Sequence, residues 1–216
     1  MNIAEVLENL KNDPRSTAVI LSAMYAQSPS EFRSSWKTLM IDDAMELARA
    51  LHDYYIEKGI SQLQKYNGES DPLGTLNGQN TLQFTSELPD NTLGLSRAKD
   101  KLNLINIRSL GSKWDQCDMI FETIPHEVAH LLQSTLVFDH GPQGLTRAGE
   151  TLFSQSFSRG QRYRLQLNED HVIVGARYLA HGKIWKQIYC NLTGFAKVKN
   201  RFFKGVTVSS SEKRSK

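Results

Sequence analysis

The chain of 216 residues is 39% hydrophobic and 23% charged, with a net charge of +3, which is ordinary for a globular domain. Its two cysteines lie far apart and outside any C-x-x-C pair, which argues against a disulfide framework and against a four-cysteine zinc ribbon. No apolar run approaches the ~20 residues that span a bilayer, and the charged start Met1–Glu8 is unlike a signal peptide.

The first part of the chain is predicted to be helical. Residues 2–27 have the pattern of one or two short helices, with a break at Asn12-Asp13-Pro14. Ser28-Pro29-Ser30-Glu31 is a good helix start, because proline and an acidic side chain both suit the first turn. An interruption is expected near Thr38.

A longer helix is predicted from an amphipathic stripe that runs from Met40 to Tyr55. Gly59 is expected to end this helix, since glycine is common just past helix ends. Residues 64–80, rich in Gly, Asn and Ser, are expected to form a loop. His52 lies beside the stripe and is interpreted as a packing or surface histidine rather than a metal ligand.

Strands are predicted next. Thr81–Phe84 is a short strand, and residues 91–97 and 101–107 form a hairpin around a turn at 98–100. The second arm of the hairpin alternates apolar and polar residues, which is the period of a half-buried strand. The edge of such a hairpin is able to hold an extended peptide by strand addition.

The strongest motif is H-E-x-x-H at His126–His130, inside a helix predicted over residues 115–136. Residues i and i+4 share a helix face, so His126 and His130 can direct two imidazoles at one ion. Glu127 can then take a proton from a metal-bound water. Apolar residues recur around the motif at helical spacing: Phe121, Ile124, Val128, Leu131, Leu132 and Leu136. Histidine and glutamate on such a core helix need a polar partner, and a zinc ion would supply one.

The rest of the chain is predicted to alternate between helix and strand. Residues 145–157 have the pattern of a short helix, and residues 163–167 and 171–174 indicate a second hairpin. A further helix is predicted over residues 179–192, with Gly194 as its stop.

The third ligand of the metal site has several candidates, since a catalytic zinc usually takes three protein ligands and keeps one position for water. His140 follows His130 by ten residues, and Glu150 follows it by twenty. His181 opens a helix in His181-Gly182-x-x-Trp185. Glycine lets the backbone approach closely there, and Trp185, one turn later, can pack this helix against the first.

The pair His126-Glu127-Val128-Ala129-His130 and His181-Gly182-Lys183-Ile184-Trp185 resembles the motifs of the SprT-like zinc metallopeptidase family, H-E-x-x-H and H-G-x-x-W/F. The likeness covers roughly residues 40–200 and implies an α+β fold. That fold would be a compact zincin-like (minimal gluzincin-like) domain, with N-terminal helices, a small sheet, an active-site helix and an inserted hairpin. The resemblance also implies Zn²⁺ held by His126, His130 and His181, with Glu127 as general base.

Two features depart from the family pattern. His181 follows His130 by 51 positions, so residues 141–178 would be an insertion, whereas His140 has the shorter spacing but Gly144 in place of the aromatic residue. The family's C-terminal zinc ribbon is missing. DNA contact would then come from a basic stretch, or that stretch is a solvated tail; its residues are Lys197, Lys199, Arg201 and Lys204.

These features predict three segments: N-terminal helices over 1–38 that pack on the domain, a metallopeptidase domain over 39–204, and a flexible basic tail over 205–216. The resemblance implies proteolysis linked to DNA, as in DNA repair. The expected function is therefore that of a zinc-dependent endopeptidase on DNA-associated or DNA-crosslinked proteins, by Glu127-assisted attack of zinc-bound water on the peptide bond. The alternative is a non-proteolytic nucleic-acid-binding protein with a structural metal site. Either function implies an intracellular location, in the cytoplasm, nucleoid or nucleus or as a viral protein in the host cytoplasm, with no membrane partner.

Overall fold

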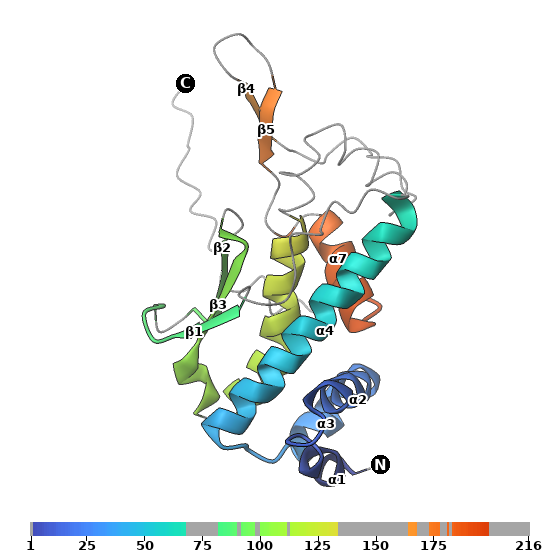
Figure 1. Cartoon of the computed structure of the whole chain (residues 1–216), viewed down its shortest axis with the longest axis vertical. Coiled ribbons are helices and arrows are strands. Elements are labelled where there is room, and N and C mark those ends of the chain that lie inside the picture. The colour runs from blue at the N-terminus through green and yellow to red at the C-terminus, as the bar shows by residue number, and fades with distance from the viewer. Residues whose placement is uncertain are drawn as a thin grey trace, which may run out of the picture.

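The computed structural model describes residues 2–67, 82–89, 92–97, 100–111, 113–133, 164–167, 173–177, 181 and 183–198. These residues form a mixed α+β fold, as the sequence predicts (Figure 1). The predicted helix over 145–157 and the tail over 205–216 lie outside the described residues. None of the helices in these ranges combines the length and apolar character that a bilayer crossing requires.

Three short helices open the chain: α1 (Ile3–Glu8), α2 (Pro14–Gln27) and α3 (Pro29–Ser35). The side chain of Asn2 caps α1 and forms a capping box with Glu5. Asp13 caps α2 through the backbone N–H of Ser16. The predicted break before Pro14, the helix start at Pro29 and the interruption near Thr38 are confirmed.

The long helix α4 (Ile41–Asn67) does not end at Gly59, so that prediction is wrong, and so is the loop assigned to residues 64–67. The reason is a close approach rather than a turn. A Cβ at position 59 would lie 2.4 Å from Leu132 Cδ1, so glycine lets α4 pack closely on the helix that carries H-E-x-x-H.

A three-stranded sheet follows, made of β1 (Leu82–Thr85), β2 (Gly94–Arg97) and β3 (Leu102–Asn106) in the order β1-β3-β2. The predicted hairpin is the antiparallel pair β2–β3, and β1 adds in parallel on the other side of β3. A 3₁₀ turn (Ile107–Leu110) then leads to the next helix. Within the described sheet, β2 therefore has one edge free.

The helix with the H-E-x-x-H motif, here called the histidine helix, covers residues 113–133. It consists of α5 (Lys113–Asp118), a π-helical turn (Met119–Thr123) and residues 124–133. Further along the chain, β4 (Arg164–Leu167) and β5 (Ile173–Arg177) form the second predicted hairpin. The last helix, α7 (Lys183–Thr193), ends before Gly194 as predicted.

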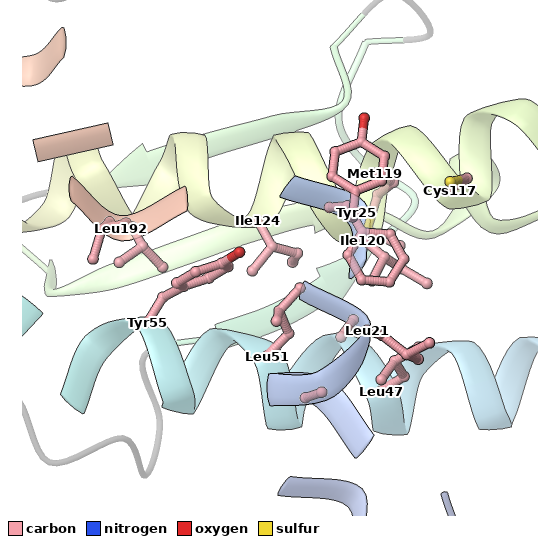
Figure 2. Packing of buried hydrophobic residues seen from close by; sticks show 14 of the residues in the cluster. Leu21, Tyr25, Leu47, Leu51, Tyr55, Cys117, Met119, Ile120, Ile124 and Leu192 are labelled. Carbon is pink, nitrogen blue, oxygen red and sulfur yellow. The ribbon is translucent and has the colours of Figure 1, made fainter. Parts of the chain in front are cut away.

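One hydrophobic core joins the helices of both halves of the chain. In Figure 2, side chains of α4 and of the histidine helix point toward one another, and side chains of α2 belong to the same cluster. They include Leu47, Leu51 and Tyr55 from α4, Ile120 and Ile124 from the histidine helix, and Leu21 and Tyr25 from α2. The N-terminal helices thus share a core with the helix that carries the motif, whose position they help to fix.

Candidate metal centre

The histidine helix changes its winding just before the motif. The backbone N–H of Ile124 bonds to the carbonyl of Met119, five residues back, where an α-helix would use the carbonyl four residues back. This wider turn ends at Thr123, three residues before His126. It therefore rotates the residues before the motif relative to the face that carries the histidines.

Three imidazoles converge beside this helix. The Nε2 atoms of His126 and His130 are 3.1 Å apart, and His181 Nε2 lies 3.1 Å from the first and 3.2 Å from the second. His126 and His130 share one face of the histidine helix, and His181 stands just before α7. All three are half-buried, and together they are able to hold a metal ion.

Hydrogen bonding alone does not explain this triangle. Each Nε2 of a neutral imidazole is either a donor or an acceptor, so among three adjacent Nε2 atoms at least two of the same kind must face each other. A tetrahedral Zn²⁺ with Zn–N bonds of about 2.0–2.1 Å places its ligand nitrogens ~3.3 Å apart. The observed separations of 3.1–3.2 Å fit that arrangement.

The three imidazoles are held in the neutral form that a metal ligand needs. Burial, with the neighbouring imidazoles adding to it, lowers the pKa of His126 to about 2 and that of His130 to about 3. Burial also lowers the pKa of His181, and the charge of Lys186 acts in the same direction. Near neutral pH the site therefore presents lone pairs rather than three positive charges.

The Trp185 side chain packs against all three histidines. Its ring centroid lies 4.6 Å from that of His126, 5.3 Å from that of His130 and 4.7 Å from that of His181. Its Nε1 also donates to the carbonyl of His126 at 3.3 Å. The buried indole thus fills the space between α7 and the histidine helix, one turn after His181, as the sequence predicts.

Glu127 lies under the free edge of β2. A Cβ at Gly94 would lie 2.8 Å from Glu127 Cγ and 2.9 Å from its Oε1, so only glycine allows this approach. The backbone N–H of Ser96 hydrogen-bonds the Glu127 carboxylate, which lowers its pKa, but burial has the larger effect and raises it to about 8. The carboxylate is thus buried between the histidine helix and the strand.

A buried charge network braces the turn before the motif. Glu122 in the π-helical turn accepts hydrogen bonds from Tyr25 and Arg33. Arg33 Nε also donates to Asp118 at 2.7 Å. The Glu122 side chain is 2% exposed, so Arg33 neutralises a charge that would otherwise be costly to bury. The network ties α2 and α3 to the histidine helix.

The structure brings together His126, His130 and His181. Of the three candidates for the third ligand, His181 is therefore the one that the structure places beside His126 and His130. His140 and Glu150 lie outside the described residues. His52 is buried and lies 3.2 Å from the amide of Asn103, in line with its interpretation as a packing residue. The sequence interpretation missed other residues around the site: Gly94, Ser96, Arg33 and Glu122. Of these residues, only Glu122 has a signal in the sequence, because it is an acidic residue inside an apolar stretch, one helical turn before His126.

Neither a protein-family model, nor a curated protein, nor a solved structure matches this chain. The geometry of the site therefore carries the functional argument.

Proposed function

We propose that this protein is a zinc-dependent endopeptidase with a zincin-like fold, of the SprT-like kind. The observation that carries the proposal is the convergence of three imidazoles beside the histidine helix. Glu127, the residue after His126 in that helix, is buried under the free edge of β2. A closed structural zinc site would use a fourth protein ligand. Three ligands with an acid beside them are the usual composition of a hydrolytic site.

In the proposed site His126, His130 and His181 hold the ion. Zinc bound there supplies a water of lowered pKa and a Lewis acid for the scissile carbonyl. The Glu127 carboxylate takes the proton of the attacking water and passes it to the leaving amide nitrogen. Burial raises the pKa of Glu127 to about 8 in the metal-free site, and a zinc ion bound beside it would favour the carboxylate form that accepts a proton.

The free edge of β2 is the proposed substrate-binding element. The carbonyl of Leu93 accepts a bond from the N–H of Asn106, so the backbone groups of odd-numbered residues in β2 point toward β3. Those of Gly94 and Ser96 therefore point to the free edge, and the Ser96 N–H meets Glu127 there. A peptide that pairs with this edge would lie next to the proposed general base.

The test compares Glu127→Gln with the wild type. Glu127→Gln should keep zinc and lose cleavage of an unfolded protein substrate by at least ~100-fold. Glu87→Gln, at an exposed glutamate, serves as the matched control and should keep both. Cleavage at the wild-type rate by Glu127→Gln would overturn the mechanism, whereas bound zinc without any turnover by the wild type would favour the structural metal site.

The proposed substrates are proteins bound or crosslinked to DNA. This part rests on the resemblance to the SprT-like family and on the basic stretch near the C-terminus, of which Lys197 is described and exposed. Cleavage of a DNA-bound protein should exceed that of the same free protein. The preference should weaken as salt rises, because phosphate contacts are screened. Equal cleavage of the free and DNA-bound protein would remove DNA from the proposal.

A further inference from the structure

The outer face of the sheet carries exposed leucines at the strand that borders the site. Gly94 and Ser96 face the histidine helix, so the alternating residues Leu93 and Leu95 face the other way. Leu93 is 38% exposed and Leu95 is 41% exposed. Leu104, the cross-strand partner of Leu95, is buried but is not part of the main core, which fits a position on the same outer face.

The direction of the backbone groups decides how a peptide added to β2 would meet these leucines. In an antiparallel addition, the N–H and carbonyl of Gly94 and the carbonyl of Ser96 are the groups that remain for the peptide at the free edge, because the Ser96 N–H already donates to Glu127. The peptide residue opposite Leu95 then belongs to a pair without mutual hydrogen bonds. Side chains approach each other most closely in such pairs, with Cβ atoms about 4.5–5.5 Å apart.

We propose that Leu95 is a specificity-determining residue that selects an apolar side chain in an extended protein substrate paired with β2. This inference rests on the proposed peptidase function. The selected side chain belongs to the residue between those that face Gly94 and Ser96, and its place relative to the scissile bond is therefore fixed. The substrate class is an unfolded segment with an aliphatic or aromatic residue at that place, which a native protein surface seldom offers.

Two features favour a substrate segment as the occupant of this surface. The remaining backbone groups of the free edge and the side chain of Leu95 belong to β2, and Leu93 directly precedes it, so one extended peptide meets both the edge and the leucines. The carboxylate of Glu127 lies at that same edge, so the bound segment passes the proposed general base. A cross-strand apolar pair stabilises by about 0.2–1 kcal/mol, which corresponds to a preference of up to about fivefold.

The test is cleavage of a randomised library of unstructured peptides by the zinc-loaded protein, with the cleavage sites identified by mass spectrometry. The wild type should enrich an apolar residue at one fixed position. Leu95→Lys should change the preference at that position to Asp or Glu, which exposure at Leu95 allows without unfolding. Met40→Lys, at a side chain that is 76% exposed and outside β2, should leave the preference unchanged.

Binding gives a second readout without turnover. In a Glu127→Gln background, a fluorescent peptide with leucine at the selected position should bind a few-fold more tightly than its glutamate analogue, and Leu95→Lys should reverse that order. Turnover with no positional preference, or with the same preference in Leu95→Lys, would overturn this inference and leave the peptidase intact. A wild type that binds zinc and cleaves nothing would overturn the proposed function, and the inference with it.

Discussion

Gly94→Ala tests the close approach of β2 to the proposed general base. The added methyl carbon would lie 2.8 Å from Glu127 Cγ, 2.9 Å from Glu127 Oε1 and 3.0 Å from Thr123 Cγ2. Overpacking of this kind costs about 1–3 kcal/mol, and we expect a loss of ~2 kcal/mol in the free energy of unfolding. Urea denaturation followed by circular dichroism measures it. Because the methyl also displaces the carboxylate, cleavage should fall by ~100-fold.

A matched glycine and a second background sharpen this test. Gly111→Ala meets only the carbonyl oxygen of Arg108 at 3.5 Å, so its unfolding free energy should change by less than ~0.5 kcal/mol. In a Glu127→Ala background the side-chain atoms behind the two shortest contacts are gone, and Gly94→Ala should cost less than ~1 kcal/mol. An equal cost of Gly94→Ala with and without the Glu127 side chain would show that the cost does not come from contact with Glu127.

Two more predictions concern charge in the core. In zinc-stripped protein the pKa of Glu127 is raised to about 8, and those of His126 and His130 are lowered to about 2 and about 3. The histidine contribution to stability is lost as pH falls below ~6.5, and the Glu127 contribution is lost as pH rises from ~4.5 to 8. Urea midpoints should therefore peak near pH ~6.5, with ~2 kcal/mol lost by pH 8, and Glu127→Gln should remove the alkaline loss. Arg33→Met should lower the free energy of unfolding by ~3 kcal/mol because it leaves Glu122 buried without its cation, and adding Glu122→Met should recover most of that loss in the same urea assay.

The sequence correctly predicted those features of the fold that depend only on neighbouring residues. The breaks at Pro14 and Pro29 follow from proline at the first helical position. The i, i+4 spacing of His126 and His130 places both on one helix face before any tertiary contact is known. Each of these features depends on a few neighbouring residues, so one sequence contains the necessary information.

Features that depend on a distant partner could not be predicted in this way. Gly59 looks like a helix end, but it is a contact surface for Leu132, which lies far along the chain. The parallel pairing of β1 with β3 joins strands that no local turn connects. The π-helical turn and the hydrogen bond from Arg33 to Glu122 likewise depend on how α2 and α3 pack. The motif alone identified His181 as a candidate ligand. That it lies beside His130 in space, although 51 positions away in the sequence, is seen only in the structure.

The three-histidine zinc site is tested by the zinc stoichiometry of the purified protein and its histidine variants. We expect one zinc per chain in the wild type and in His140→Ala, with loss of the ion in His126→Ala and in His181→Ala. His52→Gln, at a buried histidine outside this cluster, should retain the ion. Full zinc occupancy in His181→Ala would rule out the three-histidine site, because His181 would then not be a ligand.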